Sequence, residues 1–251
     1  MSSPFDLQGR TALVTGGASG IGQSIAVALA QGGCDVVLCS EQDNFDETAE
    51  RIEPLGRVVD TCLLDLSCTE DIPAVTEDLL SRHRIDILVN GAGIIRRQPA
   101  TEFSDANWRD VLDVNLTAAF QLSRLVAGPM VGRRNGKIIN IASMLSFQGG
   151  HLVTSYTASK HGLVGLTKAF ANECASSNVQ VNALAPGYIS SRTTAALRAD
   201  PARNAAILDR IPAGRWGSPE DVGGAAVFLA SSASDYVSGH VLAVDGGWLS
   251  W

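Results

Sequence analysis

The sequence has few of the features that mark membrane, secreted or nucleic-acid-binding proteins. It contains no stretch near the ~18 consecutive apolar residues of a membrane span. Its opening residues, MSSPFDLQGR, lack the charged and apolar regions of a signal peptide. Basic residues are in deficit, with 19 Lys and Arg against 26 Asp and Glu and a net charge of −7. We therefore expect a cytoplasmic protein with no nucleic-acid or membrane partner.

Patterns that bind metal ions or form disulfides are also missing. The five cysteines, Cys34, Cys39, Cys62, Cys68 and Cys174, are odd in number and show no paired spacing, and the four histidines are scattered. Such cysteines are typical of reduced, structural thiols in cytoplasm. We expect no metal site.

Apolar runs alternate with amphipathic stretches, which predicts alternating strands and helices. The expected strands are Thr11–Val14, Asp35–Cys39, Val58–Leu63, Ile85–Val89, Lys137–Ile141, Gln180–Leu184 and His240–Val244. The expected helices are Ile21–Gln31, Ile72–Arg82, Trp108–Val131, Tyr156–Cys174 and Pro219–Ala230. Short runs of Val, Ile and Leu are typical of strands buried on both faces. Because no linker interrupts the pattern, we predict one α/β domain over residues 1–251, with a doubly wound parallel sheet of about seven strands and helices on both faces.

A glycine-rich stretch, TGGASGIG, follows the first expected strand and begins the first expected helix. Its glycines Gly16, Gly20 and Gly22 allow a tight turn and a close approach to a pyrophosphate. The N–H groups at the start of the helix, around Ser19 and Ile21, would donate to that anion. A turn without a ligand is the alternative, but the strand–loop–helix context favours the dinucleotide site of a Rossmann fold.

The residues after the second expected strand indicate which nicotinamide cofactor binds. Ser40 lies 18 residues beyond Gly22, where a residue that accepts the ribose 2′-hydroxyl is expected. A 2′-phosphate would require a cation, and residues 39–46 contain neither Lys nor Arg. We therefore expect NAD rather than NADP. Glu41 is either a ribose ligand or a solvated loop carboxylate.

Two further strand ends are expected to hold the adenosine half of the cofactor. Asp65, followed by Leu66, ends the third strand and either accepts from the adenine amine or caps a turn. The fourth strand ends in Asn90-Gly91-Ala92-Gly93, where small residues let adenosine lie against the sheet edge. The cofactor site is thus expected to include Asp65, Leu66, Asn90, Ala92 and Gly93.

Ser143, Tyr156 and Lys160 form the candidate catalytic group. Ser143 ends the fifth expected strand, and the i, i+4 spacing of Tyr156 and Lys160 places both on one face of a helix. A phenol with a pKa near ~10 is a poor base at neutral pH, but a neighbouring ammonium together with the positive nicotinamide ring would lower that pKa. Tyr156 would then exchange a proton with a substrate oxygen to which Ser143 donates a hydrogen bond. The spacing alone also fits an ordinary amphipathic helix.

With these motifs in this order, essentially the whole chain resembles the short-chain dehydrogenase/reductase family. The resemblance rests on the TGGASGIG loop, the NGAG turn, Asn115 in DVNL, Ser143, the YTASK segment and Pro186-Gly187. It implies a catalytic group of Ser143, Tyr156 and Lys160, with Asn115 in a kinked helix where its carbonyl holds a relay water. Gly91 departs from the family, which usually has a second asparagine there.

The same resemblance implies how the nicotinamide half of the cofactor is held. Tyr156 and Lys160 belong to this part of the site, and Lys160 binds the nicotinamide ribose. Pro186, Gly187 and Ile189 line the nicotinamide, with the backbone of Ile189 meeting its carboxamide.

Several peptides are more specifically similar to the 2-deoxy-D-gluconate 3-dehydrogenases, also described as 2-dehydro-3-deoxy-D-gluconate 5-dehydrogenases. These peptides are NIASMLSFQGG, SYTASK, ILDRIPAGRWG, FLASSASDYVSGH and VDGGWL. The similarity implies NAD as cofactor and a ketodeoxy sugar acid as substrate. The wider family resemblance suggests a homotetramer built on the helices Asn107–Val131 and Tyr156–Cys174 and on the Gly246-Gly247 end. Leu152 departs from those enzymes, which carry a basic residue at that position.

Two other functions compete with a sugar-acid dehydrogenase. One is a reductase of another carbonyl, such as a 3-oxoacyl thioester, but the acidic chain with Ser40 and Glu41 argues against NADPH and a carrier protein. The other is a non-catalytic NAD sensor, which we would expect to lack Tyr156 or Lys160.

An acidic protein needs local cations to hold an anionic substrate. Arg96 and Arg97 follow the fourth strand near the expected crevice mouth. Arg96 is expected to be structural, whereas the planar fork of Arg97 suits a substrate carboxylate or, alternatively, a surface or interface carboxylate. Gln148, five residues past Ser143, is expected to bind a substrate hydroxyl. Residues 190–216, rich in Ala, Arg, Asp and Pro, are predicted to form a mobile, short-helical substrate lid, or else an ordered surface excursion.

Overall fold

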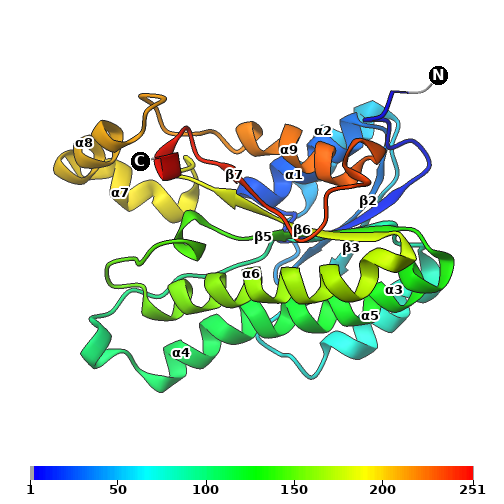
Figure 1. The fold of residues 1–251 in the computed structure, drawn as a ribbon, viewed down its shortest axis with the longest axis horizontal. Coiled ribbons are helices and arrows are strands. Elements are labelled where there is room, and N and C mark those ends of the chain that lie inside the picture. Colours follow the sequence, from blue (N-terminus) through cyan, green and yellow to red (C-terminus); the bar gives the residue numbers. More distant parts are fainter. Residues whose placement is uncertain (1–2, 251) are drawn as a thin grey trace.

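The computed structural model describes residues 3–250, which form one parallel sheet between two layers of helices (Figure 1). The strands are β1 (Thr11–Thr15), β2 (Asp35–Ser40), β3 (Val59–Leu63), β4 (Ile87–Asn90), β5 (Gly136–Ile141), β6 (Val179–Pro186) and β7 (Val241–Val244). They lie in the order β3-β2-β1-β4-β5-β6-β7, and all neighbours are parallel. The strand order reverses between β1 and β4, and sheets of this kind bind ligands in the crevice at that point.

All seven strands lie where the apolar runs predict them, so the doubly wound sheet is confirmed. Their boundaries differ from the predicted ones by one or two residues. Every residue of β4, β5 and β6 is buried, as expected for strands that helices cover on both faces.

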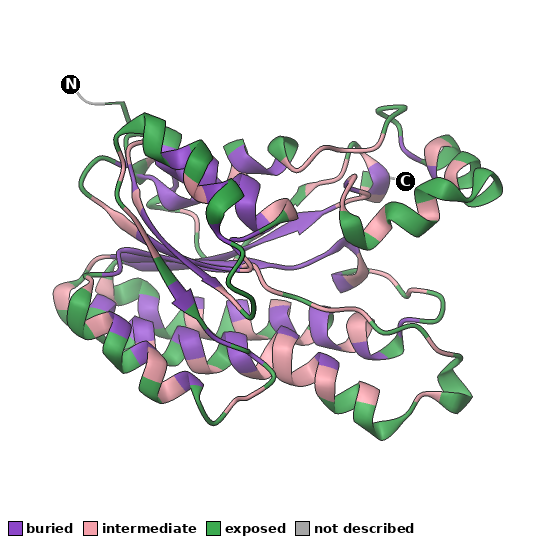
Figure 2. Cartoon of the chain, turned by 180° about the vertical axis from the view of Figure 1, so that it is seen from behind, coloured by how far each residue is buried: buried purple, intermediate pink, exposed green. Residues whose placement is uncertain are grey.

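The helices cover the sheet in two groups. They are α1 (Gly20–Gln31), α2 (Asp46–Ile52), α3 (Ile72–Arg82), α4 (Asp105–Leu112), α5 (Ala118–Arg133), α6 (Thr154–Cys174), α7 (Ala195–Ala199), α8 (Pro201–Arg210) and α9 (Glu220–Ala230). Helices α1, α2 and α9 lie on one face of the sheet, and α3, α5 and α6 lie on the other (Figure 1). Figure 2 shows that the buried residues follow the strands and the inner sides of these helices.

The helix expected over Trp108–Val131 is two helices, α4 and α5, joined by a π-helical turn at Asp113–Thr117. The helical character of the whole stretch is confirmed, and the π turn lies where the family resemblance implies a kink. A π turn contains one residue more than an α turn, and apolar periodicity does not reveal such an insertion. Asn115 lies inside this turn.

Helix α2 was not predicted from the sequence. It has seven residues, of which only Thr48 and Ile52 are buried. Two buried positions are too few to form a recognisable helical period.

The segment 190–216 contains a short 3₁₀ turn followed by α7 and α8, which project at the end of the molecule where the C-terminus lies (Figure 1). Its buried residues Ile207 and Ile211 pack with Met144 and Trp248 in a small separate core. The segment is thus helical, as predicted, and its movement as a lid stays a prediction.

Three further properties bear on which chemistry the fold supports. Within residues 3–250, no helix has both the length and the hydropathy needed to cross a membrane. The same residues contain no group of three or more His, Cys, Asp or Glu side chains arranged to hold a metal ion. The five cysteines are free thiols.

Candidate active site

The start of α1 presents backbone N–H groups that fit an anion. Its N-cap residue, Ser19, forms no side-chain cap, and the first turn contains no acidic residue. Within the described residues, nothing accepts a hydrogen bond from the N–H groups of Gly20, Ile21 or Gly22. A Cβ at Gly22 would lie 2.2 Å from the carbonyl oxygen of Gly16, so only glycine allows this approach of helix and loop. The geometry suits the pyrophosphate of a dinucleotide.

The glycine loop packs against the turn after β4, backbone to backbone. A Cβ at Gly16 would lie 3.0 Å from Cα of Ala92, and a Cβ at Gly91 would lie 2.6 Å from the carbonyl oxygen of Thr15. The Thr15 hydroxyl accepts from the N–H groups of Gly91 and Ala92 at 3.0 and 3.2 Å. The departure at Gly91 is therefore explained by close packing. Thr15 was missed in the sequence, because its partners lie about 76 residues away.

Asn90 and Gly93 contribute to the site in different ways. The Asn90 amide is buried, and its Nδ2 donates to Asn140 at 2.8 Å, which joins β4 to β5. A Cβ at Gly93 would lie 3.3 Å from Oδ1 of Asn115 and 3.5 Å from Nζ of Lys160. Gly93 therefore lies directly against two predicted catalytic residues, and direct cofactor contacts of Asn90 and Gly93 stay predictions.

The end of β2 carries no cation that is available to a phosphate. Ser40 is partly exposed and Glu41 is exposed. The one basic residue of α2, Arg51, donates to Gln23 at 3.3 Å and forms an ion pair with Glu220 at 3.6 Å. These contacts direct Arg51 towards α1 and α9.

Thr48 and Asp65 each hold a loop beside the expected cofactor site. Thr48 of α2, which was missed, donates to the carbonyl oxygen of Gly17 at 3.0 Å and so supports the glycine loop. Asp65 accepts from the N–H and the hydroxyl of Ser67, both at 2.8 Å. Of the two roles open to Asp65, the structure contains the turn cap, and an adenine contact by Asp65 or Leu66 stays a prediction.

Tyr156 and Lys160 lie one turn apart on α6, and Ser143 lies two residues beyond the end of β5 at Ile141. Burial raises the pKa of Tyr156, while a hydrogen bond with the Ser143 side chain and the charge of Arg97 lower it. From the protein's own groups, the net pKa of Tyr156 lies above its ordinary value, and the lowering expected from the ammonium together with the positive nicotinamide ring stays a prediction. Desolvation of the partly buried phenol is the largest of these effects.

Lys160 is almost fully buried and is held from two sides. Its Nζ donates to the carbonyl oxygen of Ile141 at 2.6 Å and lies 5.6 Å from the centroid of the Tyr156 ring. The Ser146 hydroxyl donates to the Lys160 carbonyl oxygen at 2.7 Å. Burial lowers the pKa of Lys160 to about 8. The ammonium is therefore poised to lose its proton close to neutral pH.

Asn115 connects the π turn to the catalytic helix. Its side chain donates to the Ile94 carbonyl oxygen at 3.0 Å and accepts from the Ile94 N–H at 2.8 Å. The same amide donates to the Ser159 hydroxyl at 3.1 Å, and Ser159 donates to the Tyr156 carbonyl oxygen. The side chain of Asn115 is thus fully committed to positioning, which leaves only its backbone for the relay that the family resemblance implies.

The backbone after β6 could contact a nicotinamide ring, as expected for this segment. Gly187 lies against Asp245, where a Cβ would be 2.6 Å from the Asp245 Cα. Ile189 is buried, and no described residue accepts from its N–H. An N–H with no partner among the described residues is available to donate to a carboxamide oxygen.

The residues predicted near the substrate differ in whether they already contact another side chain. Arg96 forms an ion pair with Asp110 at 2.6 Å, which supports its expected structural role. Arg97 is exposed and makes no hydrogen bond or ion pair within residues 3–250, although its charge acts on Tyr156. Gln148 is partly exposed, and its Oε1 accepts from Arg210 at 3.3 Å.

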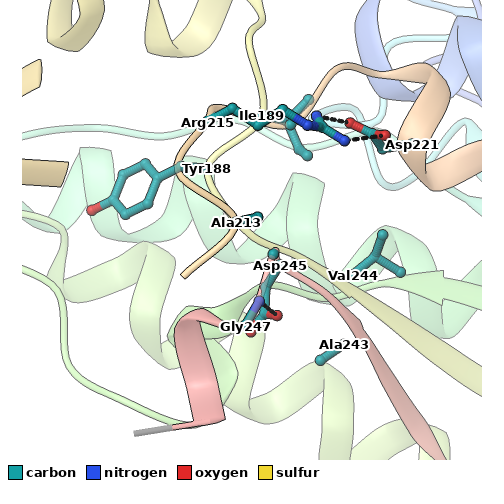
Figure 3. A pocket seen from close by; sticks show the side chains of 11 residues that line it. Tyr188, Ile189, Ala213, Arg215, Asp221, Ala243, Val244, Asp245 and Gly247 are labelled. Atoms are coloured by element: carbon teal, nitrogen blue, oxygen red, sulfur yellow. Dashed lines mark hydrogen bonds and ion pairs between the residues drawn. The ribbon is translucent and has the colours of Figure 1, made fainter. Parts of the chain in front are cut away.

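A cavity of about 390 Å³ lies between the Tyr188–Ile189 segment and the turn after β7 (Figure 3). An ion pair of Arg215 and Asp221, at 2.6 Å, lies on its wall. Neither Tyr156 nor the other predicted catalytic residues line this cavity. Figure 3 shows the Tyr188 ring directed away from the Arg215–Asp221 pair. The cavity borders the nicotinamide segment and is separate from the catalytic group.

Together, these residues can hold a dinucleotide and move one proton. Ser143 and Tyr156 offer two hydroxyls to a single substrate oxygen, and Lys160 lies behind the phenol. A nicotinamide dinucleotide fits the free N–H groups of the glycine loop and of Ile189. The arrangement suits proton exchange coupled to hydride transfer.

Comparison with known proteins agrees with this chemistry. A family model described as enoyl-(acyl carrier protein) reductase matches residues 16–249. The 2-dehydro-3-deoxy-D-gluconate 5-dehydrogenase of Bacillus subtilis (strain 168) is 56% identical over 246 residues, covering 98% of this chain and 97% of that protein. The protein of the same name from Escherichia coli (strain K12) is 52% identical over 250 residues, covering 99% and 98%.

Among solved structures, the chain is also similar to dehydrogenases of gluconate-type substrates. A protein from Beutenbergia cavernae, described as an NAD(P)-dependent gluconate 5-dehydrogenase with NADP bound at low occupancy, has a TM-score of 0.97 and 53% identity and covers 99% of this chain and 100% of that one. A protein from Agrobacterium tumefaciens, described as a 2-deoxy-D-gluconate 3-dehydrogenase with bound NADP, has a TM-score of 0.94 and 52% identity, with full coverage of both chains.

Proposed function

Because the chain belongs to the short-chain dehydrogenase/reductase family and its relatives are named dehydrogenases of gluconate-type sugar acids, we propose that it oxidises a secondary alcohol of such a sugar acid, or reduces the matching ketone. The substrate would be of the 2-dehydro-3-deoxy-D-gluconate or 2-deoxy-D-gluconate type. The observation that carries this proposal is the Ser143, Tyr156 and Lys160 group beside Arg97, a cation without a partner among residues 3–250. The names of the relatives that are 56% and 52% identical support the substrate class.

In the reductive direction, the Tyr156 phenol donates its proton to the substrate oxygen, and in oxidation the phenolate accepts it. Ser143 donates a hydrogen bond to the same oxygen and holds the reacting carbon in place. The nicotinamide cofactor supplies or accepts the hydride when bound. Lys160 would hold the cofactor ribose and stabilise the phenolate form of Tyr156, while the Asn115 side chain fixes the Ile94 backbone.

Steady-state turnover with a panel of ketones tests this function. We expect the highest kcat/KM with a keto-deoxy sugar acid and a much lower value with a 3-oxoacyl thioester. The opposite order would assign the chain to the reductases of acyl thioesters.

For the cofactor, we propose NAD. Support comes from the end of β2, where Ser40 and Glu41 offer hydroxyl and carboxylate groups and Arg51 is occupied by Gln23 and Glu220. The Beutenbergia and Agrobacterium structures contain NADP. The proposal of NAD for this chain therefore rests on its own residues at the end of β2.

Ser40→Arg should shift the preference towards NADPH, because a guanidinium can pair with the 2′-phosphate. Neutralising Glu41 as well, with Glu41→Gln, should strengthen the shift. The measurement is kcat/KM for NADH and NADPH in the wild type and both variants. A wild type that already prefers NADPH would show that our interpretation of this loop is wrong.

For the substrate carboxylate, we propose Arg97 as the anchor. Arg97→Ala should raise KM for a sugar acid about tenfold or more, which corresponds to a charge-assisted hydrogen bond of ~1.5–3 kcal/mol. The KM for the cofactor should barely change, and an uncharged analogue of the same ketone should be affected much less. If KM rose equally for charged and uncharged ketones, Arg97 would not be the carboxylate anchor. Arg192 and Arg198 would then be the next candidates.

We also propose a cytoplasmic homotetramer. Support for self-association comes from an apolar groove of about 400 Å³ between α5 and α6, lined by Leu116, Phe120, Leu166 and Ala169 among others. Phe120 is 41% exposed in the single chain, and a second copy packed on this face would cover it.

A further inference from the structure

Arg210, the last residue of α8, touches two parts of the protein that are far apart in the sequence. Its guanidinium donates to Oε1 of Gln148 at 3.3 Å, across 62 residues. Its Cζ also lies 4.0 Å from the centroid of the Trp248 ring. Arg210 therefore links the predicted lid, the loop after Ser143 and the C-terminal 3₁₀ turn.

The packing around this contact makes it well defined. Ile207 and Ile211, on either side of Arg210, lie in one small core with Met144 and Trp248. Trp248 is in turn packed edge-on against Tyr188, at 4.8 Å between ring centroids. Since Met144 directly follows Ser143, the end of α8 rests on the loop that carries the catalytic serine.

The contact also dictates which end of the Gln148 amide faces a ligand. A guanidinium has five N–H donors and no acceptor, so the carbonyl end of the amide must turn towards Arg210. The NH₂ end then points elsewhere, and no residue in the described chain accepts from it. Gln148 thus offers a donor, which suits a carboxylate, carbonyl or hydroxyl oxygen of the substrate.

We propose that Arg210 is a positioning residue that acts through Gln148: it fixes the amide so that Nε2 donates to an oxygen of the substrate. This inference rests on the proposed function, and it refines the substrate contact expected of Gln148. Without Arg210 the amide is free to rotate, and it then presents its carbonyl oxygen to an anionic substrate for part of the time.

The test is a double-mutant cycle. Arg210→Met keeps an unbranched apolar stem against Trp248 but removes the donor, and Gln148→Met removes the amide. Each variant should raise KM for the sugar acid about three- to tenfold, as expected for the loss of one hydrogen bond, with kcat within twofold and the KM for the cofactor unchanged. The KM of the double variant should not exceed that of the single variant with the higher KM, because both changes remove the same contact.

Arg210→Lys should restore most of the affinity, since an ammonium also donates to the carbonyl. Arg203→Met, two turns earlier on the same face of α8, removes a guanidinium that contacts neither Gln148 nor Trp248 among the described residues; it is the matched control and should leave KM unchanged. Additive effects in the double variant, or an unchanged KM in Arg210→Met, would overturn the proposal. If the wild type turns over another ketone but no sugar acid, the proposed function fails, and the same cycle measured on that ketone still decides the role of Arg210.

Discussion

Tyr156→Phe is expected to lower kcat by about 10²–10⁴-fold while leaving cofactor binding nearly intact. The substitution removes only the hydroxyl, which is the group that exchanges a proton with the substrate oxygen. The ring, the Lys160 ammonium 5.6 Å from its centroid and the Ser143 side chain all remain. Loss of rate without loss of binding would therefore isolate the proton transfer.

Two measurements check this result: steady-state kcat and a fluorescence titration of NADH. Tyr236→Phe provides the matched control, because Tyr236 is fully exposed and should have no effect on either value. A Tyr156→Phe enzyme that kept more than about a tenth of the wild-type rate would remove Tyr156 from the mechanism.

The order of strands and helices could be predicted from the sequence because strands buried on both faces must be apolar throughout. Runs such as Ile138-Ile139 in β5 have no other equally stable location in a protein of this size. Features that depend on single hydrogen bonds could not be predicted. The π turn at Asp113–Thr117 inserts one residue without changing which residues are apolar, and α2 buries too few residues to show a period.

Within the site, too, residues in a local sequence pattern could be predicted, whereas residues that act through distant partners could not. Ser143, Tyr156 and Lys160 were found because their spacing relates directly to one strand end and one helix face. Thr15 and Thr48 support the glycine loop through partners that lie far away in the sequence, so no local pattern could reveal them. The partner of Gln148 is on α8, and the pKa of Tyr156 depends on how many atoms surround it, which is a property of the folded state alone.

The buried Lys160 gives the second large prediction, on stability as well as activity. Burial lowers its pKa to about 8 from the ordinary lysine value of 10.5. At ~1.36 kcal/mol per pKa unit, burying the Lys160 ammonium lowers the free energy of unfolding at pH 7 by about 3 kcal/mol, compared with a Lys160 whose pKa is the same in the folded and unfolded chain. Removing the ammonium also leaves the Ile141 carbonyl oxygen without its donor, which offsets the gain by about 1 kcal/mol.

Lys160→Met should therefore abolish most of the turnover and yet raise the free energy of unfolding at pH 7 by about 1–3 kcal/mol, with a Tm higher by roughly 2–4 °C per kcal/mol. The sign of the pH dependence follows from the lowered pKa. Between pH 8 and 10.5 the unfolded chain keeps a proton that the folded wild type has released, so wild-type stability gains over this window. The advantage of Lys160→Met should accordingly be full below pH 8 and shrink towards pH 10.5.

Thermal unfolding of both proteins at pH 7 and pH 10 measures this change, and repeating the comparison in a Tyr156→Phe background removes the titration of the neighbouring phenol, which lies 5.6 Å from the ammonium. Lys168→Met, an exposed position on the same helix, is the control and should give a small difference that does not change with pH. If the Lys160→Met difference were the same at both pH values, the buried charge would not be its cause. If Lys160→Met were instead less stable at pH 7, the hydrogen bond to Ile141 would outweigh the desolvation of the ammonium.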